Sequence, residues 1–180
     1  DTIVGEGGVI LSGGQRQRIS IARALIMKPQ VLICDEVVSA LDVSIQGQIL
    51  NLLQNLRNKH NLSILFIAHD LKVSCYFCDR IGVMYKGILM EEADAHDFYK
   101  TALHPYTKLL FSSVATVTEK NDKDEQSKKI LQNEVKTAKE NIIGCPFYDR
   151  CPQRTNQCSK KLPNFTKIAN NHHIRCWNYQ

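Results

Sequence analysis

The chain has 180 residues, a formal net charge of +5 at pH 7 and an apolar fraction of 43%, so one or two domains with a hydrophobic core are expected. No apolar run approaches the roughly 18 residues of a membrane span, and no signal pattern opens the chain, so we expect membrane contact only through a partner. Basic residues are scattered among acids rather than clustered, which argues against nucleic-acid binding.

The first predicted element is a helix over residues 12–27, after a glycine-rich loop over residues 1–10. Its apolar residues recur at helical spacing: Ile19, Ala22, Leu25 and Ile26. Ser12 and two glycines form its entry, where unpaired N–H groups and the positive end of the helix dipole attract anions. A capped surface helix without a ligand is the alternative for this segment alone.

An apolar run over residues 31–34 leads directly into two acids, Asp35 and Glu36. The run predicts a strand buried on both faces of a parallel sheet. Its carboxyl end is where open α/β sheets bind ligands. Two adjacent carboxylates are costly to bury without a partner, so a cation or a reacting group is expected beside them. An exposed acidic turn is the alternative.

A second strand-forming run, residues 62–68, follows a predicted helix and ends at His69. Asp42 caps that helix, and Asn61 ends it. Its apolar stripe predicts core packing: Ile45, Ile49, Leu52, Leu53 and Leu56. Strand, helix and strand in succession predict a right-handed βαβ unit.

Shorter elements follow: a helix over 72–79, a hairpin of 81–85 with 88–91 around Lys86-Gly87, and a helix over 95–102. Cys75 and Cys78 have C-x2-C spacing without a second pair nearby, and we interpret them as ordinary helix residues. Residues 116–141 are polar and charged, with too few apolar residues to fold alone, and predict a linker.

The last segment, residues 142–180, contains four cysteines with the spacing C-x5-C-x6-C-x17-C: Cys145, Cys151, Cys158 and Cys176. Prolines follow the first two and stiffen these turns. Four thiolates can bind zinc, although C-x2-C pairs are its more common signature, and they are also the usual ligands of iron–sulfur clusters. Disulfides are the remaining alternative.

Four motifs in this order resemble the ATP-binding subunits of ABC transporters: LSGGQ at 11–15, VLICDE at 31–36, SALD at 39–42 and the histidine of AHD at 68–70. They correspond to the signature, Walker B strand, D-loop and switch histidine. Three further segments resemble oligopeptide and dipeptide importers: DVSIQGQILNLL at 42–53, LHPYTKLL at 103–110 and GCPFYDRCP at 144–152. The stretch VGEGGVILSGGQRQRIS is closer to ABC exporters.

The resemblance implies an α/β fold: the C-terminal half of an ABC-type nucleotide-binding domain, a parallel sheet with flanking helices, plus a small Cys-rich extension. It divides the chain into a partial ATPase domain (1–92), a helical extension (93–115), a charged linker (116–141) and a metal-binding tail (142–180). The phosphate loop G-x-x-x-x-G-K-[ST] occurs nowhere in the sequence. Family members carry it upstream of the signature, so the chain looks truncated.

Roles are carried over by resemblance. Asp35 would hold Mg²⁺ directly or through water, Glu36 would orient and polarise the attacking water, and His69 would contact that water and the γ-phosphate of ATP. Asp42 would couple the two sites of a dimer. The signature residues would complete the ATP site of the opposite subunit: Ser12, Gly13, Gly14 and Gln15. The family usually has a proline after the Walker B glutamate, and Val37-Val38 in its place is expected to loosen the turn.

For the tail, some importer ATPases bind a [4Fe-4S] cluster with this cysteine spacing, and the resemblance implies the same for Cys145, Cys151, Cys158 and Cys176. Zinc is the second choice, and a cytosolic ATPase makes disulfides the least favoured.

The predicted function is therefore that of an ATP-binding and ATP-hydrolysing subunit of an ABC importer that energises peptide uptake. Its expected cofactors are ATP and Mg²⁺, and its expected partners are a second ATPase subunit and transmembrane permease subunits. Its expected location is cytoplasmic, at the inner face of the cell membrane. Two alternatives are kept: an exporter ATPase fragment, and a non-catalytic metal-binding regulator built on a degenerate ATPase.

Overall fold

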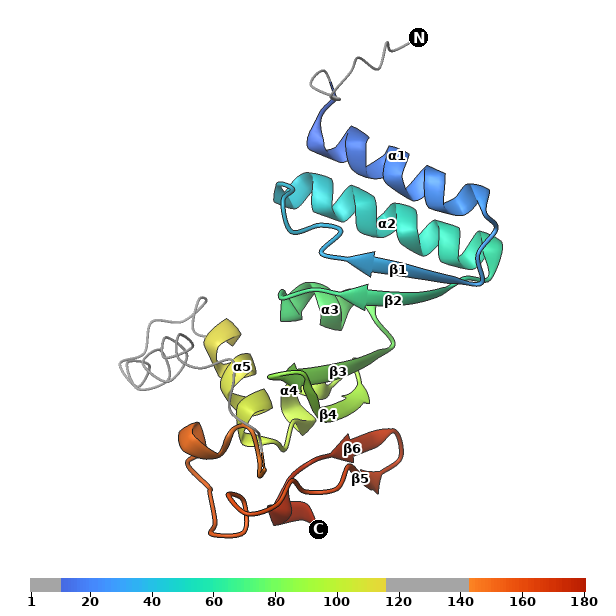
Figure 1. Ribbon diagram of the computed structural model, residues 1–180. Helices are drawn as coiled ribbons and strands as arrows, with labels where there is room; N and C mark the ends of the chain where they lie inside the picture. Colours follow the sequence, from blue (N-terminus) through green and yellow to red (C-terminus); the bar gives the residue numbers. More distant parts are fainter. Residues whose placement is uncertain (1–10, 116–142) are drawn as a thin grey trace. The chain divides into compact units, whose positions relative to one another are not determined.

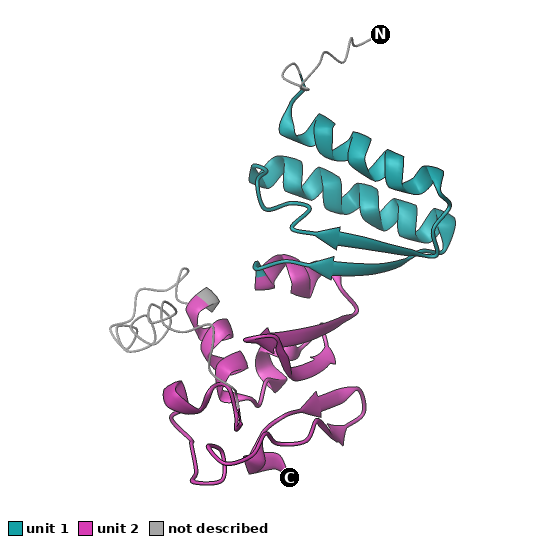
Figure 2. Ribbon diagram, viewed as in Figure 1, with its two compact units in different colours: residues 1–70 teal, residues 71–180 magenta. Residues whose placement is uncertain are grey.

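A computed structural model describes residues 11–115 and 143–180 (Figure 1). The predicted loop at 1–10 and the whole of the predicted linker at 116–141 lie outside these residues. The chain divides into two compact units, Asp1–Asp70 and Leu71–Gln180 (Figure 2). The cysteine-containing tail belongs to the second unit, together with the hairpin and the HPYT segment. None of the described helices is long and apolar enough to cross a membrane.

The first unit is a strand–helix–strand arrangement preceded by a helix. Helices α1 (Gly13–Ile26) and α2 (Val43–His60) run side by side, on the same side of strands β1 (Val31–Asp35) and β2 (Ser63–Ile67) (Figure 1). The strands pair in parallel, from Val31 opposite Ser63 to Asp35 opposite Ile67. The predicted parallel arrangement is confirmed.

Strand β1 is not buried on both faces, and that prediction was wrong. Leu32 and Cys34 are buried, whereas Val31 and Ile33 on the opposite face are 56% and 64% exposed. Within the described residues of the first unit, both helices lie on the other face. A continuous apolar run indicates that a strand can be buried on both faces, but whether the strand is buried depends on the elements that pack against it.

The two helices of this unit begin and end at the residues expected. Ser12 is the N-cap of α1, and Asp42 is the N-cap of α2. Asn61 ends α2 in the left-handed conformation, φ 51°. The buried face of α1 differs from the predicted stripe: Gly14 and Ile21 are buried, whereas Ala22 and Ile26 are exposed. The contact of α1 with α2 selects this face.

The second unit is built on a four-stranded antiparallel sheet in the order β3-β4-β6-β5. Its strands are β3 (Arg80–Tyr85), β4 (Ile88–Asp94), β5 (Thr166–Ala169) and β6 (His172–Ile174). Lys86 and Gly87 both have positive φ, 47° and 77°, as the tight turn of a two-residue hairpin requires. This confirms the predicted hairpin, although β4 extends three residues beyond the predicted end at Glu91.

Among the described residues of this unit, three helices and two short 3₁₀ turns accompany the sheet: α3 (Leu71–Phe77), α4 (Phe98–Thr101), α5 (Pro105–Ala115), η2 (Tyr148–Arg150) and η3 (Trp177–Tyr179). The core joins the hairpin to the tail through aromatic side chains. The ring of Tyr85 lies 4.6 Å from that of Tyr106 and 5.4 Å from that of Phe147. Phe147, from the tail, is 1% exposed. The tail is therefore part of this core.

Candidate functional site

Glu36 and His69 meet at the carboxyl ends of β1 and β2. The Nδ1 atom of His69 lies 2.8 Å from Oε2 and 3.1 Å from Oε1 of Glu36. Parallel pairing brings the two strand ends to the same edge, and the Glu36 N–H donates to the carbonyl of Ile67 at 2.9 Å. Both side chains are substantially exposed, 42% for Glu36 and 72% for His69. The pair can therefore reach a ligand or a water at this edge.

The turn after Glu36 is held by its own hydrogen bonds. Ser39 donates to the Glu36 carbonyl through both its N–H and its hydroxyl, at 3.1 and 2.9 Å. Gln46 donates to the carbonyl of Val38 at 3.0 Å, and both valines that replace the usual proline are buried. Glu36 itself has φ 48°, an uncommon conformation for a residue with a side chain and one found often at functional sites.

The predicted signature residues form the N-terminus of α1. The Ser12 hydroxyl accepts from the Gln15 N–H at 3.2 Å, and the Gln15 side chain accepts from the Ser12 N–H at 2.9 Å, which is a capping box. These bonds use the N–H groups of Ser12 and Gln15. The N–H groups of Gly13 and Gly14 remain for an acceptor from outside the helix.

Gly14 has a packing role that the sequence did not suggest. A Cβ atom at this position would lie 2.7 Å from Cγ2 of Ile45 on α2. Only glycine allows the start of α1 to approach α2 this closely. Gly14 therefore holds the LSGGQ segment against α2, the helix whose N-cap is Asp42.

Asp42 and Asp35 are placed by the ends of regular elements. The Asp42 carboxylate accepts from the Ile45 N–H and the Ser44 hydroxyl, both at 3.0 Å. These bonds, the backbone one first, lower the pKa of Asp42 below its usual value. Asp35 is the last residue of β1, directly before Glu36, and is exposed. The structure thus brings Asp35, Glu36 and His69 to one edge of the sheet.

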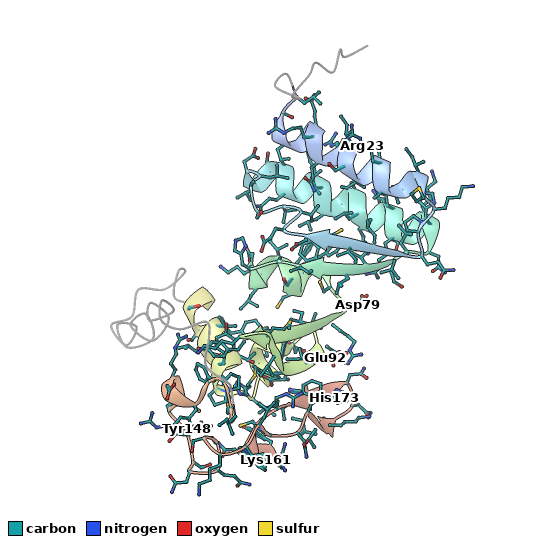
Figure 3. All side chains as sticks on the ribbon, in the orientation of Figure 1. Arg23, Asp79, Glu92, Tyr148, Lys161 and His173 are labelled. Carbon is teal, nitrogen blue, oxygen red and sulfur yellow. The ribbon has the colours of Figure 1, made fainter. Side chains whose placement is uncertain are left out.

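In the second unit, Glu91 organises a buried network that sequence analysis missed. Its carboxyl oxygens accept from the N–H groups of Leu103 and His104, at 2.7 and 3.0 Å, and hydrogen-bond Nε2 of His172 at 2.8 Å. Glu91 is completely buried. Its neighbour Glu92 points to the other face, where it pairs with Arg80 at 2.7 Å and lies 3.9 Å from His173 (Figure 3).

His104 is the N-cap of α5 in the HPYT segment. Its carbonyl accepts the first helical bond, from the Lys108 N–H at 3.0 Å, and its Nδ1 accepts from the Tyr106 N–H at 3.1 Å. Pro105 occupies the first helical position, which favours proline. Burial lowers the pKa of His104 to about 4, although nearby Glu91 acts in the opposite direction.

The four cysteines of the tail line one cavity, together with His104, Pro163 and Trp177. All four are free thiols. The sulfurs of Cys145, Cys151 and Cys176 accept backbone hydrogen bonds from the residues two positions later: Phe147, Gln153 and Asn178. Cys158 Sγ lies 3.5 Å from the Thr155 N–H and 3.2 Å from its hydroxyl. Each of the four sulfurs in the tail therefore has a polar neighbour in its own loop.

Burial raises the pKa of three of these thiols, Cys145, Cys151 and Cys176. It brings that of Cys145 to about 11 and raises those of Cys151 and Cys176, while the backbone hydrogen bonds act in the opposite direction. Gly144 allows the two loops of the cavity to meet, because a Cβ there would collide with the Cys158 carbonyl. The Cys145 N–H donates to that same carbonyl at 2.7 Å.

Comparisons with known proteins agree with the motifs. A model of the ABC transporter family matches residues 1–39, which contain the signature and the Walker B strand. A model described as the oligopeptide/dipeptide transporter C-terminal region matches residues 90–158, from the end of the hairpin to the third cysteine of the tail. The chain is related to the ATP-binding proteins of oligopeptide ABC transporters.

Relatives of this family match nearly the whole chain. The oligopeptide transport ATP-binding protein AppF of Bacillus subtilis is 46% identical over 93% of the chain. OppF of Haemophilus influenzae is 45% identical over 92% of it. These alignments cover 51% and 49% of the two relatives, so the chain spans about half the length of the ABC transporter proteins that it matches.

Solved ABC transporter cassettes share the fold. The ATP-binding cassette MJ1267 in its ADP conformation matches with a TM-score of 0.52 and 26% identity. The alignment covers 58% of this chain and 41% of that cassette. The predicted α/β fold, matching part of an ABC ATP-binding cassette, is confirmed.

A single metal ion bound by the four thiols of the cavity is one expected occupant. Among residues 11–115 and 143–180, no group of three or more His, Cys, Asp or Glu side chains could hold one. A single zinc ion requires all its ligand atoms about 2.0–2.3 Å from one point. A [4Fe-4S] cluster requires less crowded thiols, because each binds a different iron.

Proposed function

We propose that this chain forms the signature-to-C-terminus part of an ATP-binding subunit that energises peptide uptake by an ABC importer. The observation that carries the proposal is the contact between His69 Nδ1 and Glu36 Oε2, 2.8 Å long, at the edge of a parallel β-sheet. In phosphoryl transfer to water, a positioned carboxylate polarises the water, and catalysis comes mainly from positioning and charge stabilisation. Glu36 has this role, and His69 orients it.

The remaining residues act around the same reaction. Asp35 holds Mg²⁺ directly or through water. The N–H groups of Gly13 and Gly14, at the positive end of α1, bind the γ-phosphate of an ATP molecule held by a second ATPase subunit. Asp42 begins α2 beside this helix end and couples the two ATP sites of the dimer. Transmembrane permease subunits are the further partners, which places the protein at the inner face of the cell membrane.

The test of this proposal is a calorimetric titration with Mg-ATP. The chain carries no phosphate loop, whose N–H groups and lysine supply most of the contacts to the phosphates. One helix N-terminus contributes about 1–2 kcal/mol, whereas sub-millimolar binding requires about 5–6 kcal/mol. We expect no tight binding by the chain alone and binding when a phosphate-loop-bearing partner is present. Tight binding of Mg-ATP by the chain alone would refute the proposal that each ATP site needs residues from a partner that carries a phosphate loop.

We propose further that the tail binds a [4Fe-4S] cluster through Cys145, Cys151, Cys158 and Cys176. Support comes from the shared cavity and from the hydrogen bonds that the cysteine sulfurs accept within their own loops. Anaerobic purification or reconstitution should yield a brown protein with four iron and four sulfide ions per chain, as the cluster composition requires. Zinc bound in place of iron, or thiols that remain freely alkylatable after reconstitution, would refute it.

A further inference from the structure

The loop between Glu36 and Asp42 is fastened to helix α2 by the side chain of Gln46. Its Nε2 atom donates to the carbonyl of Val38 and to the carbonyl of Leu41, both at 3.0 Å. An amide NH₂ group has two hydrogens, so these two bonds use all of its donors. An amide oxygen in the same place would face two acceptors, so the contacts also determine which end of the amide points to the loop.

The carbonyl of Leu41 depends on this side chain because of where the helix begins. Asp42 is the N-cap of α2, and its carbonyl accepts the first helical bond, from the Gln46 N–H at 2.9 Å. Leu41 precedes the cap, so its carbonyl lies outside the ladder of helical bonds. The Gln46 side chain reaches beyond the bond that its own backbone makes and joins the loop to the first turn of α2.

The other end of the loop is joined to Glu36. Ser39 donates to the Glu36 carbonyl through its N–H at 3.1 Å and through its hydroxyl at 2.9 Å. The Leu41 N–H donates to the Val38 carbonyl at 3.2 Å, which is the same carbonyl that accepts from α2. A continuous series of hydrogen bonds therefore leads from α2 to the backbone of Glu36.

The backbone of Glu36 needs such support. Its φ of 48° costs free energy for a residue with a side chain, and this conformation persists only where the surrounding structure holds it. Val37 and Val38 stand where the ABC family usually has a proline, and this replacement was expected to loosen the turn. The hydrogen bonds from Ser39 and Gln46 supply a constraint at this position.

We infer that Gln46 is a positioning residue, whose side chain fixes the loop between Glu36 and Asp42 and thereby the placement of both residues. The inference rests on the roles proposed above for these two carboxylates. One amide group on α2 sets the position of the carboxylate that polarises the water relative to the one that couples the two ATP sites.

Two substitutions separate the donors of Gln46 from the size of its side chain. Gln46→Leu has a similar size and no donor. Gln46→Lys restores donors on a flexible side chain, because an ammonium group carries three N–H bonds. Gln48→Leu is the matched control on the same helix, since Gln48 is exposed and its amide oxygen accepts from Arg18 of α1 at 2.6 Å.

The experiment is nuclear magnetic resonance on the 180-residue chain without nucleotide. In Gln46→Leu, hydrogen exchange at the Ser39 and Leu41 N–H groups should be about 30-fold faster, because two hydrogen bonds of ordinary strength that close the loop are lost. Gln46→Lys should bring both rates back towards those of the wild type, and Gln48→Leu should leave them unchanged.

The imidazole nitrogens of His69 provide a readout that a purely structural role would not change. Nδ1 lies 2.8 Å from Oε2 of Glu36, so its resonance reports the contact with that carboxylate. In Gln46→Leu this resonance should move towards its position in Glu36→Ala. In Gln46→Lys and Gln48→Leu it should stay at the wild-type position.

Faster amide exchange in Gln46→Leu with an unchanged His69 resonance would overturn the inference, because the side chain would then stabilise the loop without placing Glu36. The same changes in Gln48→Leu, or no recovery in Gln46→Lys, would also overturn it. The proposed function fails by a different result: no binding of Mg-ATP when the wild-type chain meets a phosphate-loop-bearing partner. That result, with a His69 resonance that moves as expected, would leave the positioning by Gln46 in place.

Discussion

Replacement of Glu91 by glutamine should destabilise the second unit strongly. The carboxyl group of Glu91 is completely buried and accepts hydrogen bonds at both oxygens, from Leu103 and His172 at Oε1 and from His104 at Oε2. An amide supplies only one oxygen. Its NH₂ group would face either the His104 N–H or the two donors at Oε1, and in each case at least one buried donor would lose its partner.

The size of the effect follows from these contacts. A buried donor left unpaired costs about 1–3 kcal/mol, and hydrogen bonds to a charged group are worth about 1 kcal/mol more than those to a neutral one. We therefore expect Glu91→Gln to lower the free energy of unfolding by about 4 kcal/mol, a large part of the 5–15 kcal/mol typical of a domain. With a urea m-value of about 2 kcal/mol/M, the unfolding midpoint falls by about 2 M.

The assay is urea denaturation followed by the fluorescence of Trp177, which is the single tryptophan of the chain and lies in the second unit. Glu92→Gln is the matched control, since it removes the same charge from the next residue of β4. The Glu92 pair with Arg80 is partly exposed and should contribute less than about 1 kcal/mol. If the two variants unfold at the same midpoint, the reasoning about Glu91 is wrong.

Three further outcomes are expected. Gly14→Ala should destabilise the first unit, because the new Cβ would press on Ile45. Gly47→Ala, inside α2 with open space around it, should instead stabilise this unit by about 0.5–1 kcal/mol. Thermal unfolding followed by circular dichroism measures both effects. In the folded chain the pKa of His104 is about 4, whereas in the unfolded chain it is about 6.5. The free energy of unfolding of the iron-free chain should therefore fall by about 3 kcal/mol as the pH is lowered from 6.5 to 4. A His104→Asn variant whose free energy of unfolding falls as much would contradict this. In a longer protein that adds a phosphate loop to this chain, Glu36→Gln should bind ATP yet turn it over roughly 100-fold more slowly or worse, and parental turnover would refute the role of Glu36.

Local signals predicted the first unit well. Ser12 and Asp42 are N-cap residues by type, and Asn61 tolerates the left-handed conformation that ends α2. The contact of Glu36 with His69 follows from two apolar runs that each end in a polar residue, once parallel pairing is assumed. These features depend on a few neighbouring residues, so the sequence is sufficient to find them.

The second unit depends on contacts that no local pattern contains. Glu91 and Glu92 are adjacent acids in one strand, and nothing in their neighbourhood tells which is buried. The difference arises from partners at positions 103, 104 and 172. The exposure of Val31 and Ile33 was missed for the same reason, because burial is a property of the neighbours and not of the run itself.

The pairing of β6 with β4 also has a consequence for synthesis of the chain. Glu91 lies opposite Ile174, and Glu92 opposite His173, so the outer edge of the hairpin is covered by residues more than eighty positions later. At about 5–20 residues per second, a ribosome needs roughly 4–16 s to make that interval. During this time β4 presents unpaired N–H and C=O groups, which can pair with a strand of another nascent chain. Completion of the tail ends this exposure, and a ribosome that stalls before β6 leaves a chain prone to aggregate.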